Sequence, residues 1–103
     1  MKRNYMRTIP KEWRALAKVF VALGDEHRQR ILLTFEKGER LTVGQIAEIA
    51  TLSRPAVSHH LKILRQAGVL DAQREGREVY LRINRGTLEQ TLATVLDFVR
   101  TES

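Results

Sequence analysis

Basic and hydroxyl side chains gather on the outward side of a helix predicted near the middle of the chain. The outward residues are Arg54, Ser58, His59 and Lys62, and Arg65 sits further along. Arginine can donate two hydrogen bonds to guanine, and serine can bond either a base edge or a phosphate. The N-terminus of a helix also favours a nearby phosphate. This set of residues predicts a helix face that contacts nucleic acid.

A second group of basic residues surrounds a predicted turn. Arg74 and Arg77 flank the pair Glu75-Gly76. Two arginines beside a flexible turn suit contact with a minor groove or with phosphates, which position a protein on DNA without reading its sequence. Glu75 and Glu78 add negative charge at the same place and weaken this indication.

The charge balance of the whole chain points the same way. Its 103 residues include 18 Lys and Arg against 12 Asp and Glu, a net charge of +6. Such an excess favours a polyanionic partner, of which nucleic acid is the commonest. A basic surface without a specific role is the alternative, so the positions of the charges must decide. They favour double-stranded DNA.

Several classes of function lack the residues they need. The chain has no cysteine, which excludes thiolate metal sites, disulfides and thiol redox switches. No nucleophile motif, phosphate-binding loop or carboxylate–histidine cluster is present, so we expect neither an enzyme nor a cofactor. The longest apolar run, Val19–Leu23, is too short to span a membrane. No signal peptide is recognisable, and a cytoplasmic location is expected.

The histidines offer a metal-binding alternative that their spacing disfavours. His59 and His60 are adjacent, and neighbouring residues on a helix point about 100° apart. We therefore expect His59 to face DNA and His60 to pack against its own domain, with His27 a surface or packing residue. No metal site is predicted from these residues.

Carboxylates on the last predicted helix leave a second metal-binding alternative open. Glu89 and Asp97 lie eight residues apart and roughly share a face, and Glu102 follows them. Carboxylates on exposed helix faces are usually solvated charges. A hard-cation site shared across a dimer axis is the less favoured interpretation.

The first half of the chain is predicted to hold three helices. Residues 1–9 are expected to form a loose basic arm, and Pro10 to open a helix that runs to Leu23. Asp25 is suited to cap a second helix, which ends near Lys37 before Gly38. Residues 42–45 read Thr-Val-Gly-Gln, a capping box that starts a short third helix.

The second half is predicted to hold two helices and a β-hairpin. Ser53 can cap the outward-facing helix described above, with Arg54 and Pro55 in its first turn. Residues 69–74 and 77–83 read as two strands joined by Glu75-Gly76, and the second of them alternates clearly. Residues 87–90 read as another capping box, opening a helix to residue 101. The order ααααββα predicts a mainly α fold with a small β-hairpin, a winged helix-turn-helix spanning residues 41–83.

Three segments carry a resemblance to a known family. They are residues 22–32 (ALGDEHRQRIL), residues 57–70 (VSHHLKILRQAGVL) and residues 74–77 (REGR) followed by VYL at 79–81. Together they resemble the ArsR/SmtB family of bacterial repressors, over roughly residues 13–99. The resemblance implies that residues 10–103 form one winged helix-turn-helix domain that binds an inverted repeat in DNA. On the matching positions, Ser58 and His59 are the expected base readers, joined by Arg54.

The resemblance also implies a homodimer in which the first and last helices, residues 10–23 and 87–101, pair across the axis. This accounts for a first helix that is more apolar than a surface helix should be. The residues expected at the interface are Trp13, Leu16, Phe20, Leu88, Leu92, Val95, Leu96 and Val99. Aromatic residues there, among them Phe98, are expected to pack in the dimer, and an effector pocket is the alternative.

The chain departs from the metal-sensing members of this family. Those members place a cysteine pair before the recognition helix, or histidine and carboxylate ligands on the last helix; this chain has no cysteine and no histidine on its last helix. We therefore expect release from DNA by an unidentified small-molecule or protein effector. Two alternatives remain: a winged-helix module that binds protein, and a repressor that senses metal through carboxylates.

Overall fold

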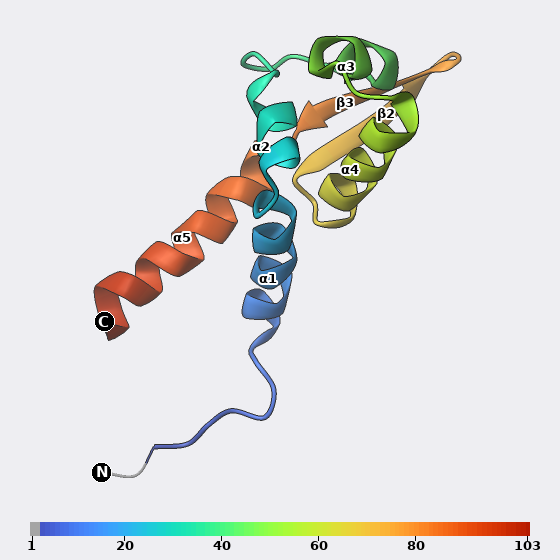
Figure 1. The fold of residues 1–103 in the computed structure, drawn as a ribbon. Coiled ribbons are helices and arrows are strands. Elements are labelled where there is room, and N and C mark those ends of the chain that lie inside the picture. The colour runs from blue at the N-terminus through green and yellow to red at the C-terminus, as the bar shows by residue number, and fades with distance from the viewer. Residues whose placement is uncertain (1–2) are drawn as a thin grey trace.

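Five helices and a three-stranded antiparallel sheet make up the chain, as a computed structural model shows for residues 3–103 (Figure 1). The first two residues of the predicted arm lie outside the described residues. In chain order the elements are α1 (Lys11–Leu23), α2 (Glu26–Leu33), β1 (Leu41–Thr42), α3 (Val43–Ala50), α4 (Arg54–Gln66), β2 (Leu70–Glu75), β3 (Glu78–Ile83) and α5 (Arg85–Glu102). The predicted winged helix-turn-helix is confirmed, and the two-residue strand β1 is an addition to it.

The helices α1, α2, α3 and α4 and the three strands share one hydrophobic core. The inward stripe of α4 is almost fully buried, with Val57 and Leu64 at 0% exposure. Each such side chain contributes about 1.5–3 kcal/mol on burial. Around the stripe pack Val19, Ala22, Ile31, Leu41, Ile46, Ala47, Leu61, Val69, Leu70 and Leu81. Because this core holds the inward face of α4, the opposite face of α4 must point to solvent.

The sheet has the order β1-β3-β2, with β3 in the centre. Leu81 of β3 pairs with Leu41 on one side and Ala72 on the other, which explains why it is buried. Glu75 pairs with Glu78, so the hairpin loop is Gly76-Arg77 and the predicted loop, Glu75-Gly76, was wrong by one residue. Gly76 has φ 60°, and the first position of a two-residue type II′ loop requires such a value.

Three of the predicted helix starts are confirmed by hydrogen bonds. The Asp25 carboxylate accepts from the Arg28 N–H at 3.1 Å, and this bond holds the pKa of Asp25 below its usual value. Thr42 and Gln45 form the reciprocal capping box, at 2.8 and 3.1 Å. The Ser53 hydroxyl accepts from the Ala56 N–H at 3.3 Å. These local signals position α2, α3 and α4 along the chain.

Two predicted helix limits were wrong. Helix α2 ends at Leu33 and not near Lys37. The hydroxyl of Thr34 donates to the Ile31 carbonyl. The N–H groups of Thr34 and Phe35 donate to carbonyls three residues back, a tighter 3₁₀ pattern that ends the α-helix. Helix α5 begins at Arg85, before the predicted start at residue 87. Its cap is the side chain of Asn84, which accepts from the Thr87 N–H at 3.1 Å, so the capping box predicted at residues 87–90 does not form.

Helices α1 and α5 lie at the end of the molecule opposite the hairpin tip. Figure 1 shows α5 diverging from α1 toward its C-terminus, while residues 3–10 continue away from the start of α1. Residues 3–10 are exposed and belong to no helix or strand, as expected for the arm. Within α5, all of which the structure describes, Thr91 is the one buried residue. The apolar side chains of α5 are therefore mostly uncovered within the chain.

Thr51 adopts a strained conformation between α3 and α4, which generates a stability prediction. Among the described residues it is the one non-glycine residue with positive φ, at 55°. A left-handed conformation costs an ordinary residue about 1–2 kcal/mol, whereas glycine loses about 0.5–1 kcal/mol of chain entropy. We expect Thr51→Gly to raise the free energy of unfolding by about 0.5–1 kcal/mol in urea titrations at fixed protein concentration.

The matched control is Thr34→Gly, which makes the same change where φ is −77°. This variant loses the hydroxyl bond to Ile31 and should be less stable than the wild type. A drop in stability for Thr51→Gly comparable to that of the control would contradict the assignment of strain.

Candidate nucleic-acid interface

The outward face of α4 carries every recognition-helix residue that the sequence analysis selected. All of them are exposed, while Val57, Leu61 and Leu64 of the same helix are buried. The exposed set is Ser53, Arg54, Pro55, Ser58, His59, Lys62 and Arg65. Helix α4 thus presents one continuous basic and polar face, with the position of that face set by the core behind it.

Arg54 links the two helices of the helix-turn-helix. Its guanidinium lies against α3, where a methyl group on Gly44 would come within 3.3 Å of Arg54 Nη2. Glycine at position 44 therefore leaves the space that this arginine occupies. In this position Arg54 is exposed and close to the first turns of both α3 and α4, so it can reach a phosphate or a base edge by rotating its side chain.

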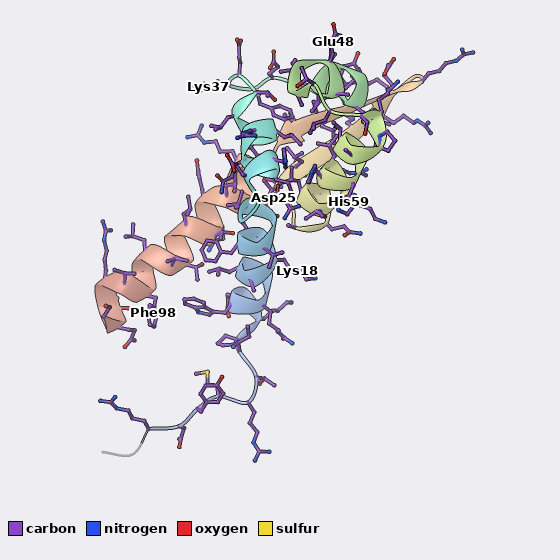
Figure 2. The ribbon with its side chains drawn as sticks, in the orientation of Figure 1. Lys18, Asp25, Lys37, Glu48, His59 and Phe98 are labelled. Atoms are coloured by element: carbon purple, nitrogen blue, oxygen red, sulfur yellow. The ribbon has the colours of Figure 1, made fainter. Side chains whose placement is uncertain are left out.

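The adjacent histidines differ in exposure, although their ring centres are 5.6 Å apart. His59 is exposed, and Figure 2 shows it on the outer side of α4. His60 is half-buried and turned toward α2, where its ring stacks on that of His27 at a centroid distance of 5.7 Å. Burial lowers the pKa of His60 below its ordinary value, and the nearby Arg28 guanidinium lowers it further, against the opposing effect of Asp25. His60 therefore packs between α4 and α2, whereas His59 faces solvent.

Arg28 is a residue that sequence reasoning missed. Its side chain is 11% exposed and donates to the carbonyls of Ala22 at 2.8 Å and Val21 at 3.2 Å. These carbonyls belong to the last turn of α1, where few backbone N–H groups remain to pair with them. The Val21 carbonyl also accepts from the Gly24 N–H at 3.2 Å. Arg28 also contacts His60 Nδ1 at 3.3 Å. It therefore connects α1 to α4, and no spacing rule within one helix would have revealed it.

The wing is held by a second arginine that the sequence did not reveal. Arg40, just before β1, forms an ion pair with Glu75 and lies 4.4 Å from the centre of the Tyr80 ring. The charge of Glu75 is therefore balanced by Arg40. Arg74 and Arg77 remain exposed near the hairpin tip, which strengthens the basic character that the sequence assigned to the wing.

The residues predicted at a dimer interface fall into two groups. Phe20, Leu92, Leu96 and Val99 are 42–57% exposed, which is unusual for side chains of this size. Trp13, Leu88 and Val95 are half-buried. Leu16 is only 5% exposed within the chain itself, so it has little surface left to contribute to an interface.

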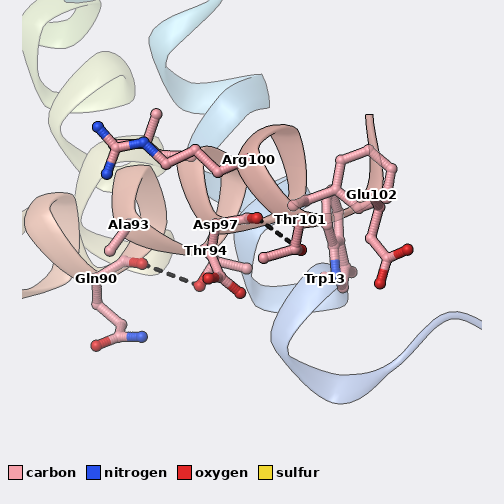
Figure 3. A pocket seen from close by; sticks show the side chains of 10 residues that line it. Trp13, Gln90, Ala93, Thr94, Asp97, Arg100, Thr101 and Glu102 are labelled. Atoms are coloured by element: carbon pink, nitrogen blue, oxygen red, sulfur yellow. Dashed lines mark hydrogen bonds between the residues drawn. The ribbon is translucent and has the colours of Figure 1, made fainter.

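A groove between α1 and α5 is lined by Trp13 and Phe98, two of the aromatic residues for which an effector pocket was the alternative to dimer packing (Figure 3). Trp13 and Phe98 meet edge to face at 5.5 Å, and the groove beside them measures about 610 Å³. Its other walls include the polar side chains Asp97 and Arg100 of α5. Phe20 does not line this groove; it borders a separate apolar depression that includes Met6 and Ile9.

The described residues offer no ready metal site. Across residues 3–103, no three histidine, aspartate or glutamate side chains lie close enough together to hold an ion. Glu89, one of the three carboxylates considered above, forms an ion pair with Arg85. None of the helices in the same part of the chain combines the length and apolar character that crossing a membrane requires.

Comparison with known proteins places this geometry in context. Residues 25–72 match the family model described as bacterial regulatory protein, arsR family. The chain is 40% identical over 81 residues to the transcriptional repressor SdpR of Bacillus subtilis, covering 79% of this chain and 89% of that relative. An ArsR-like transcriptional regulator from Rhodococcus sp. RHA1 superposes with a TM-score of 0.79 at 30% identity, over 85% and 82% of the two chains.

A third similarity concerns the fold. A homodimeric winged helix-turn-helix DNA-binding domain of Mycobacterium bovis superposes with a TM-score of 0.69 at 21% identity, covering 96% of this chain and 94% of that one. That match extends over nearly the whole chain, so the fold of this chain recurs in a solved structure.

The contacts of Arg40 generate a prediction about the wing. Removing the side chain in Arg40→Ala breaks the ion pair with Glu75 and the contact with Tyr80. Because the pair is exposed, we expect overall stability to fall by no more than about 1 kcal/mol. Amide hydrogen exchange in β2 and β3 near the tip should nevertheless become faster.

Arg30→Ala is the control, because it removes an exposed ion pair with Glu26 on α2, away from the wing. Wing amides that exchange equally fast in both variants and the wild type would show that Arg40 does not hold the wing.

Proposed function

This chain belongs to the ArsR family of bacterial regulatory proteins, which are DNA-binding transcriptional regulators and not enzymes, and we propose that it is a homodimeric repressor. In this proposal each protomer places α4 in the major groove of one half of an inverted-repeat operator. An effector that binds elsewhere on the dimer releases it from DNA, in the bacterial cytoplasm where the nucleoid lies. Repression is supported by the name of the relative of which this chain covers 89%.

The observation that carries the proposal is the two-sided character of α4. Its inward stripe is locked in the core, while seven exposed residues, Ser53 and Pro55 among them, form the opposite face. A helix fixed in this way offers its first turns to base edges in a major groove. Arg54, Ser58 and His59 lie in those turns and are assigned to base reading.

Phosphate contacts are assigned to the residues further from the start of α4 and to the wing. Lys62 and Arg65 lie one and two turns beyond the base readers and are exposed. Arg74 and Arg77 lie at the hairpin tip, which projects from the body of the molecule (Figure 1). Each phosphate contact releases counterions, so the logarithm of the binding constant should fall by about 0.9 per contact against the logarithm of salt concentration.

Exposed apolar surface on α5 supports the homodimer. Leu92 is 57% exposed, Leu96 46% and Val99 49%, all on a helix with little cover from its own chain. Apolar surface of this kind is stabilised by burial against another chain. A two-fold dimer would set the half-sites about one helical turn, 34–36 Å, or a multiple of it apart.

Base reading and phosphate contact predict different effects on DNA binding. Ser58→Ala and Arg54→Ala should each relax sequence preference at one position by about 1–3 kcal/mol. Lys62→Ala should weaken binding to all sequences alike and reduce the salt slope by about 0.9. Gel shifts on a selected operator and its single-base variants, at several salt concentrations, measure both effects.

Lys37→Ala is the matched control, because it also removes one exposed lysine but lies on the far side of α2 from His59 (Figure 2). It should leave the preference and nearly all of the salt slope intact. If sequence preference stays unchanged in both Arg54→Ala and Ser58→Ala, α4 is not the reading helix.

The dimer prediction uses a charge on the uncovered face of α5. Leu92→Glu would bury a carboxylate in the proposed interface, so we expect self-association to weaken about a hundredfold or more. Sedimentation over a range of concentrations measures the change. Leu33→Glu, at a position on α2 that is 84% exposed, should leave the assembly intact. A Leu92→Glu variant that associates as the wild type does would contradict the interface.

A further inference from the structure

One side chain bridges the last turn of α1 and the inner edge of α4. Arg28, nearly buried, donates through Nε to the carbonyl of Ala22 and through Nη2 to that of Val21. Its remaining terminal nitrogen, Nη1, lies 3.3 Å from His60 Nδ1. His60 lies directly after His59 and two residues after Ser58, both on the outward face of α4. A displacement of His60 would therefore also move Ser58 and His59, which are assigned to DNA contact.

The chemistry of this contact specifies the protonation state of His60. A guanidinium has five hydrogen-bond donors and no acceptor. Arg28 must therefore donate, and His60 Nδ1 must accept through its lone pair, with the ring proton on Nε2. Protonation of His60 would place a second N–H at Nδ1 against the Arg28 N–H and add a positive charge beside an arginine that is always charged. The contact exists only while His60 is neutral.

Among the charged groups around His60, the Asp25 carboxylate opposes that repulsion, and its effect on the pKa of His60 is larger than that of Arg28 but smaller than that of burial. The charged or titratable side chains that face it are Asp25, His27 and Arg28 from the start of α2, and His59 from α4. Asp25 is the one anion among them. It already accepts from the Arg28 backbone and lies 4.0 Å from the Arg28 guanidinium. Asp25 therefore favours the protonated ring, but it cannot restore the hydrogen bond from Arg28, which requires a free lone pair on His60 Nδ1.

We propose that Arg28 and His60 form a proton-sensitive link that positions the recognition helix, so that protonation of His60 breaks this contact, loosens the position of α4 against α1 and weakens DNA binding. The inference rests on the proposed role of α4 in reading DNA. Arg28 and His60 act here as positioning residues, since neither lies on the outward face of the helix.

The direction of the pH effect follows from the environment of His60. Burial holds its pKa below the ordinary value of 6.5, so the unfolded chain takes up the proton first as the pH falls. The stability that neutral His60 contributes is complete above pH 6.5 and is lost as the pH falls from there toward the pKa of the folded state. Acid also makes the protein as a whole more positive, which acts on DNA affinity in the opposite direction.

The variant His60→Asn separates these two effects. The asparagine carbonyl oxygen can stand where Nδ1 stands and accept from Arg28, yet it does not titrate. The experiment measures the operator affinity of the full-chain wild type and of His60→Asn at pH 7.5 and 5.5, at constant ionic strength. Wild-type affinity relative to that of His60→Asn should fall about two- to tenfold on acidification, because only the wild type loses the hydrogen bond with Arg28 and one such bond is worth about that factor. An identical pH profile in both proteins would overturn the proposal.

A second measurement on DNA-free protein keeps the inference testable if the variant folds poorly. Nitrogen-15 NMR of the histidine rings should find the neutral His60 proton on Nε2, with titration below pH 6.5. Amides of α4 and of Val21 and Ala22 should shift with the same midpoint. A His60 proton on Nδ1, or a titration that leaves those α1 amides unmoved, would contradict the link.

His27→Asn is the control, because it removes a neighbouring imidazole on α2 without touching the Arg28 contact. It should retain the acid-induced loss of affinity. If affinity responds neither to Ser58→Ala nor to pH, the role of α4 in reading DNA fails, and this inference with it. If Ser58→Ala alters preference but pH acts equally on wild type and His60→Asn, only the link fails.

Discussion

Burial of the inward stripe of α4 is the interaction on which the rest of the structure depends. Val57, Leu61 and Leu64 are 0–3% exposed and meet side chains from α1, α2, α3 and the sheet in one core. Interiors of this kind are closely packed and resist rotation of a helix about its axis. Because the buried side is fixed, so is the side that faces solvent. The basic outward face of α4 is thus a consequence of packing.

Two arginines add side-chain contacts to that constraint, one within the body of the domain and one at the wing. Arg28 joins the end of α1 to α4 through the carbonyls of Val21 and Ala22 and through His60. Arg40 joins the strand β1 to the wing through Glu75 and Tyr80. The first contact is nearly buried and the second is exposed. Disturbance of Arg28 should therefore affect the whole fold, and disturbance of Arg40 mainly the wing.

The sequence predicted those features that depend on neighbours along the chain. The caps at Asp25, Thr42 and Ser53 follow from residues three positions apart, and the inward stripe of α4 from helical spacing. Features that depend on distant partners were missed. Strand β1 forms only because Leu41 and Thr42 meet β3. The side chains of Arg28 and Arg40 find partners 32 and 35 residues away, beyond the range of any local rule.

The central claim is that the outward face of α4 and the wing tip contact DNA. Amide chemical-shift mapping of the dimer on addition of operator duplex tests it most directly. We predict that the largest shifts fall in the first two turns of α4, around Arg54 and Ser58, and at Gly76 in the hairpin loop. Shifts centred on the exposed sides of α2 and α3, around Leu33 and around Glu48 (Figure 2), with α4 unperturbed, would contradict the account.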